Sequence, residues 1–222
     1  MTHGHDVDRF NRWASTYDRH WMQRIVFEPI QRTVLQMAAE EIGRPATILD
    51  VGCGTGKLLR SAGQRFPGAR LVGVDAALEM VKQAQSSTPD SSSIQFQQAT
   101  AEALPFPNRS FDLVFSTMTF HHWQDQRRGA AEVARVLSPD GRWLLAEFVP
   151  SGFMKQVRRL LRLHQFPDRG HLREVLEGVG LKVVKDQRVS GLRGQVAVMA
   201  IGPIASPRSG EVGARSAPGG GY

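Results

Sequence analysis

The residues with the clearest chemical meaning form a glycine-rich loop in the first quarter of the chain. An apolar run that begins at Ile48 ends in Asp50, and glycines then occupy every second position, at Gly52, Gly54 and Gly56. Glycine is used where the backbone approaches a ligand closely or adopts a positive φ. A helical pattern follows at once, and the first turn of a helix has unpaired N–H groups. The loop therefore predicts a small-molecule site built largely from backbone atoms.

The spacing of this loop excludes two common nucleotide-binding loops. The dinucleotide fingerprint G-x-G-x-x-G needs a glycine at position 57, where the chain has Lys57. A Walker A loop needs a glycine five residues before Gly56, where the chain has Val51, and a serine or threonine after the lysine, where it has Leu58. We therefore expect a ligand that is bound without a pyrophosphate loop.

An acidic residue ends the next predicted strand. Asp75 follows the run 72–74 and lies 19 residues after Gly56. A carboxylate in this place can accept hydrogen bonds from both hydroxyls of a ribose, as the acidic residue of dinucleotide-binding folds does. We therefore expect a ligand that contains a ribose. The alternative is that Asp75 only caps a helix that starts at Ala76.

Alternating strand and helix patterns surround these residues and predict an α/β fold. Strands are expected at 47–51, 70–74, 94–98, 111–116, 142–148, 181–187 and 195–201. Helices are expected at 57–66, 77–87, 124–137, 153–164 and 168–178, with a turn at Ser138–Gly141. Such alternation is typical of βαβ units and of a parallel sheet. The domain that contains the sheet is expected to span residues 47–202.

The segment 1–46 predicts two helices before the first strand. The first helix has an apolar face formed by Phe10, Trp13, Ala14, Tyr17 and Trp21. The second runs from about Pro29 to Glu41 and stops before Pro45. We interpret the segment as a helical lid, with Tyr17 touching the ligand; simple packing on the domain is the alternative.

Composition limits the class of protein further. Of 222 residues 41% are hydrophobic and 22% charged, and no apolar run approaches the length of a membrane-spanning helix. The single cysteine, Cys53, excludes an intrachain disulfide, a zinc–thiolate cluster and a CxxC redox pair. The first residues lack the apolar segment of a secretory signal, so a cytoplasmic location is expected.

The net charge of +7 is concentrated late in the chain, because residues 151–202 contain ten Lys or Arg and four Asp or Glu. The stretch 155–162 predicts a helix with four basic side chains on one face: Lys155, Arg158, Arg159 and Arg162. An ordinary solvated helix, a surface for an acidic substrate and weak peripheral membrane contact are all open. Residues 203–222 are rich in Gly, Pro and Ser and predict a disordered tail.

Together these residues resemble the class I S-adenosylmethionine-dependent methyltransferases. The matching stretches are Asp50–Gly56, Asp75, Ala99–Phe106, Ser110–Val114 and Arg135–Gly141. The opening Arg12–Asp18 is similar to the subgroup that contains the ubiquinone and menaquinone biosynthesis methyltransferases. The resemblance covers about residues 9–202. It implies a Rossmann-like, mostly parallel seven-stranded sheet in the order 3-2-1-4-5-7-6, with helices on both faces and the last strand antiparallel.

The resemblance also implies S-adenosylmethionine as the cofactor, S-adenosylhomocysteine as its product and a small molecule as the methyl acceptor. Asp50 and the backbone of Gly52, Gly54 and Gly56 would then lie along the methionine end of the cofactor. Asp75 would hold the ribose.

The adenine end is assigned in the same way. Ala76 and Met80 would flank the adenine, although Met80 could equally be core packing. Ala101 and Glu102 would meet its edge through backbone groups. Many relatives have an aspartate where this chain has Thr100, whose hydroxyl can still accept a hydrogen bond from the adenine amino group.

Two adjacent histidines, His121 and His122, follow the fourth predicted strand, which ends at Ser116. Ligands of α/β sheets bind at the carboxyl ends of strands. We therefore expect Ser116 to contact the cofactor and the histidine loop to face the transferred methyl. One histidine, with His121 ahead of His122, could deprotonate a hydroxyl nucleophile; the alternative is that they cap a helix and pack. No third ligand has suitable spacing, so no metal is expected.

Two rival functions remain to be weighed. Methyltransferases that act on base amino groups commonly carry an Asn/Asp-Pro-Pro-aromatic loop after strand four, where this chain has Ser116–Thr119. Cytosine C5 chemistry needs a cysteine nucleophile after that strand, and Cys53 is the only cysteine. Both features count against a nucleic-acid substrate. A non-catalytic protein that binds S-adenosylmethionine stays open.

Overall fold

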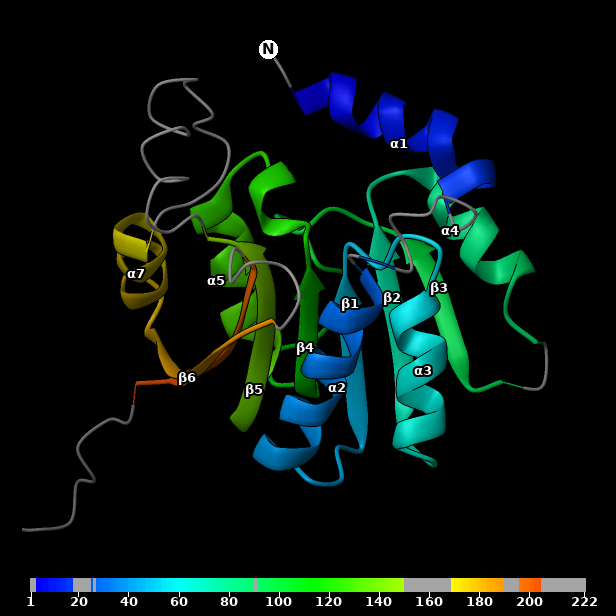
Figure 1. The fold of residues 1–222 in the computed structure, drawn as a ribbon. Coiled ribbons are helices and arrows are strands. Elements are labelled where there is room, and N and C mark those ends of the chain that lie inside the picture. Colours follow the sequence, from blue (N-terminus) through cyan, green and yellow to red (C-terminus); the bar gives the residue numbers. More distant parts are fainter. Residues whose placement is uncertain are drawn as a thin grey trace, which may run out of the picture.

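The structure is a computed structural model that describes residues 3–17, 25, 27–89, 92–149, 169–189 and 196–204; for 3–6 and 15–17 it describes the backbone alone. A seven-stranded sheet in the order β3-β2-β1-β4-β5-β7-β6 forms its centre (Figure 1). The strands are β1 Thr47–Val51, β2 Arg70–Asp75, β3 Ile94–Gln98, β4 Phe111–Thr117, β5 Leu137–Phe148, β6 Leu181–Arg188 and β7 Val196–Pro203. The first five strands pair in parallel, and β7 is antiparallel to both of its neighbours. The predicted fold class and strand order are confirmed.

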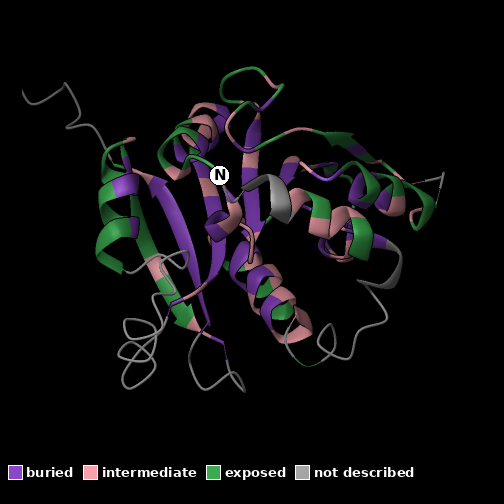
Figure 2. Cartoon of the chain, turned by 90° about the horizontal axis from the view of Figure 1, so that it is seen from above, coloured by how far each residue is buried: buried purple, intermediate pink, exposed green. Residues whose placement is uncertain are grey.

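Helices cover both faces of this sheet. One face is covered by α2 Glu28–Glu41, α3 Lys57–Arg65 and α4 Leu78–Ser86, and the other by α5 Gln126–Val136 and α7 Arg169–Glu177. Each helix buries one apolar stripe; in α5 it consists of Ala130, Val133 and Val136. Figure 2 shows the central strands as a buried layer between half-exposed helices, whereas the edge strands β3 and β6 are largely exposed. Among the described residues no helix has the length and apolar character needed to cross a membrane.

The strand register brings the polar strand ends to one edge of the sheet. β1 lies between β2 and β4, and Asp50 is level with Gly73 on one side and Phe115 on the other. Asp75 is the last residue of β2. Since parallel strands end on the same side, the glycine loop and both aspartates meet there.

Among the strands, two boundaries differ from the prediction by two residues or more. β5 already starts at Leu137, because Ser138–Gly141 is absorbed into the strand across an irregularity opposite Phe111 and Leu113. β7 extends to Pro203, and the N–H of Ile204 still donates to the carbonyl of Gly180. The predicted helix at 153–164 and the tail from residue 205 lie outside the described residues.

The predicted lid segment 1–46 contains two helices with different positions. The apolar stripe of α2, including Ile30, Val34 and Met37, is fully buried and belongs to the core beside the sheet. By contrast α1, His3–Tyr17, contacts α4 and lies beyond the edge of the sheet where the parallel strands end (Figure 1). Only α1 therefore occupies the position of a lid.

Candidate active site

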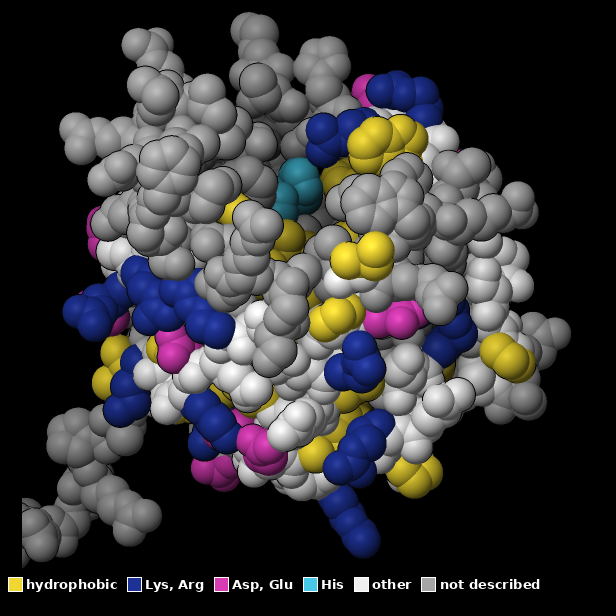
Figure 3. Space-filling view, viewed as in Figure 1, with side chains coloured by type: hydrophobic (Ala, Val, Ile, Leu, Met, Phe, Trp, Pro, Cys, Tyr) yellow, Lys and Arg dark blue, Asp and Glu magenta, His cyan; other side chains and the backbone are white. Residues whose placement is uncertain are grey.

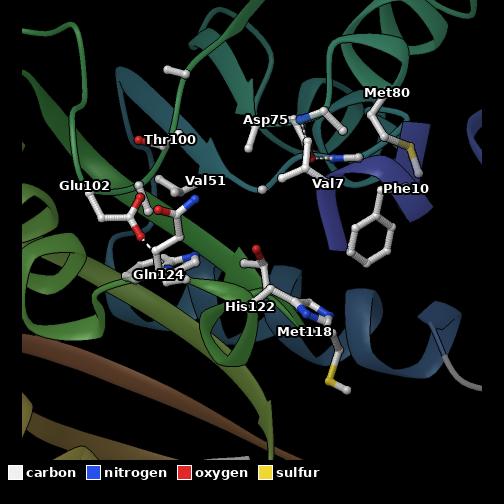
Figure 4. A pocket seen from close by; sticks show the side chains of 18 of the residues that line it. Val7, Phe10, Val51, Asp75, Met80, Thr100, Glu102, Met118, His122 and Gln124 are labelled. Atoms are coloured by element: carbon white, nitrogen blue, oxygen red, sulfur yellow. Dashed lines mark hydrogen bonds between the residues drawn. The ribbon is translucent and has the colours of Figure 1, made fainter. Parts of the chain in front are cut away.

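A pocket opens at the carboxyl ends of β1, β2 and β4. Its walls come from the glycine loop, the segment after β3, the loop after β4, the start of α4 and helix α1. Figure 3 shows a histidine and hydrophobic side chains on this face of the molecule, close to α1. Figure 4 shows the lining residues converging from these separate elements. The pocket thus lies where parallel α/β sheets bind their ligands.

The glycine loop has the backbone that the spacing predicts. Gly52, Gly54 and Gly56 all have positive φ, at 79°, 53° and 78°. A Cβ at position 52 would lie 2.2 Å from the Oγ1 of Thr119, so the loop after β4 closes directly on Gly52. Gly52 and Gly54 line the pocket, whereas Gly56 does not. Gly56 is instead the N-cap of α3, and a Cβ there would lie 2.6 Å from the ring of Phe96.

Asp75 joins the glycine loop to the start of α4. Its Oδ2 accepts a hydrogen bond from the N–H of Gly54 at 2.8 Å, and its Oδ1 accepts one from Ala77 at 2.9 Å. Burial raises the pKa of Asp75, while these two hydrogen bonds act to lower it. Asp75 also lines the pocket, and each carboxylate oxygen can accept a further hydrogen bond. Asp75 thus braces the loop before α4 and borders the pocket, but it does not cap α4, whose N-cap is Ala77.

Asp50 lies behind the lining, at the end of β1. It is 2% exposed, and within the described structure its Oδ1 has no hydrogen-bond partner. Burial, together with the charge of Asp75, raises the pKa of Asp50 to about 8. A buried acceptor without a donor is costly. This side chain therefore suits a ligand that brings a donor or a positive charge to the carboxyl ends of the strands.

The predicted adenine-end residues, Ala76, Met80, Thr100, Ala101 and Glu102, all line the pocket. The carboxylate of Glu102 accepts hydrogen bonds from the N–H groups of Gln124 and Asp125 at 2.7 and 3.2 Å, so its side chain ties two loops together. The backbone carbonyl of Glu102 accepts a hydrogen bond from the Nε of Arg128 at 2.9 Å, so its contact with the adenine edge stays a prediction. Met80 is 2% exposed and packs with Ala77, so it fills the core and borders the pocket at once.

Helix α1 supplies two lining residues that were not predicted, Val7 and Phe10. Phe10 lies edge-on to the ring of His122 at 5.1 Å (Figure 4). Asn11 fixes the helix in place, because its Oδ1 accepts a hydrogen bond from the N–H of Glu79 at 3.0 Å. The apolar periodicity places Phe10 on the inner face, but nothing in the sequence shows that this face meets the pocket. The side chain of Tyr17 lies outside the described residues.

The prediction that Ser116 contacts the cofactor is wrong. Ser116 does not line the pocket: it is fully buried, and its hydroxyl accepts a hydrogen bond from the indole N–H of Trp143 at 3.1 Å. β4 continues through Thr117, one residue beyond the predicted end, so Thr117 takes the place at the pocket. The next residue, Met118, has φ of 55°, a strained conformation for this residue type that turns the chain across the pocket.

The two histidines have different surroundings in the structure. His122 lines the pocket, with Thr119 and Gln124 near it. His121 is 8% exposed, and its Nδ1 lies 2.9 and 3.0 Å from the two carboxylate oxygens of Glu147. Glu147 was not predicted, because in the sequence it is an ordinary residue of an apolar strand.

Other predicted features can be placed only in part. Among the described residues, no group of three His, Cys, Asp or Glu side chains could hold a metal ion. Burial and the nearby Asp75 and Asp50 raise the pKa of the Cys53 thiol, so it is a poor nucleophile. The basic stretch 155–162 lies outside the described residues.

A Rossmann-like sheet of this order, with a glycine loop and two acids at its central strand ends, places the chain among the α/β proteins whose pocket lies at the carboxyl ends of parallel strands. Comparison with known proteins identifies the family to which the chain belongs. Residues 49–145 match the methyltransferase domain family. The chain is 38% identical over 169 residues to a demethylmenaquinone methyltransferase of Deinococcus radiodurans, covering 74% of this chain and 66% of that protein.

Two further proteins agree with this match. A malonyl-[acyl-carrier protein] O-methyltransferase of Hahella chejuensis is 30% identical over 224 residues, which cover 85% of this chain and 78% of that protein. A methyltransferase of Burkholderia thailandensis, solved with 1,6-didemethyltoxoflavin and S-adenosylhomocysteine, shares the fold with a TM-score of 0.67 at 20% identity, over 92% of this chain and 91% of that one. The chain belongs to the class I S-adenosylmethionine-dependent methyltransferase family. It spans about half to two thirds of the length of several curated relatives.

Proposed function

We propose that the protein transfers the methyl group of S-adenosylmethionine to a small-molecule acceptor. The observation that carries the proposal is the pair of acids at the central strand ends. Asp75 braces the glycine loop and still borders the pocket, while Asp50 is buried with an unpartnered Oδ1. A ribose and the ammonium group of a methionine moiety together match these two needs.

The lining supports a role for each residue. Asp75 would accept hydrogen bonds from the ribose hydroxyls, and Asp50, behind the lining, would offer a negative charge to the ammonium group. Thr100 would accept a hydrogen bond from the adenine amino group, with Ala76 and Met80 as apolar neighbours. The bound cofactor supplies a methyl group activated by its sulfonium. The protein then has to hold the acceptor in line with that methyl and exclude water.

Helix α1 suits the task of excluding water. Val7 and Phe10 close one wall of the pocket, and Asn11 fastens the helix to the start of α4. We include α1 in the proposal as a lid that must move aside when cofactor and product exchange.

The relatives support a small or carrier-bound acceptor. Their names specify a demethylated menaquinone and a malonyl group on a carrier protein. The first name specifies a quinone and the second an O-methylated malonyl group, so these acceptors differ in chemistry. The proposal therefore specifies methyl transfer to a small or carrier-bound acceptor and does not specify the chemical group that is methylated.

An acceptor panel tests the proposal. The protein is incubated with S-adenosylmethionine and 1,4-dihydroxynaphthalene, malonyl-acyl carrier protein or duplex DNA, and release of S-adenosylhomocysteine is followed by mass spectrometry. Turnover with either of the first two, absent in Asp75→Ala, supports the proposal. Binding of S-adenosylhomocysteine without turnover on the whole panel would favour the non-catalytic alternative, and turnover on DNA would overturn the acceptor class.

A further inference from the structure

Beyond Asp75 the pocket continues along the segment that follows β3. Asp75 is level with Gln98 in the sheet, and its backbone carbonyl accepts a hydrogen bond from the N–H of Ala99 at 3.1 Å. Residues 99–102 line the pocket there, whereas the glycine loop follows β1, on the other side of β2. With the ribose at Asp75 and the methionine end toward Asp50, as proposed above, the base is directed toward residues 99–102.

Among the described lining residues beyond Asp75, Glu102 is the charged one, and the protein itself engages it. Its Oε1 accepts hydrogen bonds from the N–H groups of Gln124 and Asp125 at 2.7 and 3.2 Å (Figure 4). Its backbone carbonyl accepts one from the Nε of Arg128 at 2.9 Å. Glu102 therefore holds the loop that carries Gln124 against the segment that carries Thr100.

Two neutral side chains, those of Thr100 and Gln124, complete this end of the pocket. Both residues line the pocket and are exposed. Within the described part of the chain, neither side chain makes a hydrogen bond. A hydroxyl can donate or accept, and a carboxamide carries both N–H donors and a carbonyl acceptor. This end of the pocket can therefore present a donor or an acceptor at each of two positions.

Purine bases differ in the direction of two adjacent hydrogen bonds. Adenine has an amino donor at C6 and an acceptor at N1, whereas hypoxanthine has a carbonyl acceptor at C6 and an N–H donor at N1. An ionised carboxylate only accepts, so a carboxylate facing C6 would select the amino group. A hydroxyl facing C6 can pair with either group.

We propose that Thr100 and Gln124 are specificity-determining residues that let the pocket bind 6-oxopurine as well as 6-aminopurine nucleoside thioethers. This inference rests on the proposed function and extends its ligand class to S-inosylhomocysteine. With adenine, the Oγ1 of Thr100 accepts from the amino group and the amide of Gln124 donates to N1. With hypoxanthine, the hydroxyl donates to the carbonyl and the amide oxygen accepts from the N1–H. Each exchange is a rotation of an exposed side chain.

Calorimetry with S-adenosylhomocysteine and S-inosylhomocysteine at pH 7.5 tests the inference without a methyl acceptor. The wild type should bind the two thioethers with Kd values within about tenfold of each other, because both bases find partners at C6 and N1. A larger gap overturns the inference and leaves the proposed function standing. Binding of neither thioether overturns the proposed function and the inference together.

Two variants remove the ability to pair in both directions. Thr100→Asp offers only an acceptor at C6, and Gln124→Lys offers only donors at N1. Each should widen the gap between the two Kd values at least about tenfold in favour of S-adenosylhomocysteine, since an unmatched polar group costs roughly 5- to 150-fold in affinity. Retained binding of S-adenosylhomocysteine shows that the fold and the site are intact in each variant.

Gln97→Glu is the matched control for the added negative charge. Gln97 is an exposed residue of β3, three positions before Thr100, and it is not among the lining residues. Its gap should equal that of the wild type. A gap that either Thr100→Asp or Gln124→Lys leaves unchanged overturns the inference even if S-inosylhomocysteine binds, and so does an equal widening in Gln97→Glu.

Discussion

Replacing Asp50 by asparagine tests the electrostatic core of the site. The side chain is 2% exposed, and burial together with Asp75 raises its pKa from 3.8 to about 8. The folded protein without cofactor therefore keeps a proton on Asp50 over a range of pH in which the unfolded chain has lost it. Since the folded state binds more protons between these two pKa values, its stability falls as the pH rises from about 4 to 8.

The loss of folding stability can be calculated from the raised pKa of Asp50. Each pH unit within this window is worth about 1.4 kcal/mol, so raising the pH from 5 to 8 costs the wild type up to about 4 kcal/mol through Asp50. Asp50→Asn cannot ionise and lacks this contribution. We therefore expect the free energy of unfolding of the variant, measured with urea, to rise relative to that of the wild type between pH 5 and pH 8. The difference between the two proteins should grow by up to about 4 kcal/mol over this range.

The same residue should couple cofactor binding to proton release. A positive group near Asp50 favours its ionised form, so S-adenosylhomocysteine should expel a proton near pH 7 and bind more tightly as the pH rises toward 8. Calorimetry in two buffers of different ionisation enthalpy measures this release, which should vanish in Asp50→Asn. Equal pH dependence of unfolding in the variant and the wild type would refute the reasoning.

Three further variants probe the pocket wall, each by calorimetry with S-adenosylhomocysteine. Asp75→Ala should weaken binding at least about tenfold, since hydrogen bonds to a charged group are worth about 1.5–3 kcal/mol each; unchanged affinity contradicts a ribose contact. Gly52→Ala should abolish binding, because its Cβ would lie 2.2 Å from Thr119 Oγ1, whereas Gly43→Ala, with φ of 71° and open space, should bind normally. Phe10→Ala should weaken binding several-fold; an unaltered affinity would remove α1 from the cofactor site.

The sheet and the acid positions were predictable because both depend on local signals. The strands at 47–51 and 94–98 have the predicted bounds, since Gly, Pro and polar residues flank short apolar runs there. The sequence alone predicted that Asp50 and Asp75 lie close together, because the carboxyl ends of parallel strands lie at one edge of the sheet. The twelve-residue strand β5, Leu137–Phe148, shows the limit of local signals, because the predicted turn at Ser138–Gly141 became part of a strand that pairs with β4.

The parts that were missed depend on contacts between distant segments. His121 and Glu147 are 26 residues apart and meet only because β4 and β5 are neighbours. A single extra residue of β4 turns Ser116 toward Trp143 and puts Thr117 at the pocket. The split of the segment 1–46 into a core helix and a pocket helix likewise follows from packing that periodicity alone does not specify.

The most direct test of the central claim is a calorimetric titration with S-adenosylhomocysteine, NAD and ATP at pH 8, where Asp50 is free to ionise. The account predicts one-to-one binding of S-adenosylhomocysteine, weakened in Asp75→Ala and in Asp50→Asn, and no measurable heat with NAD or ATP. Binding of NAD or ATP as tight as that of S-adenosylhomocysteine, or no binding of S-adenosylhomocysteine at all, would contradict the assignment of this pocket.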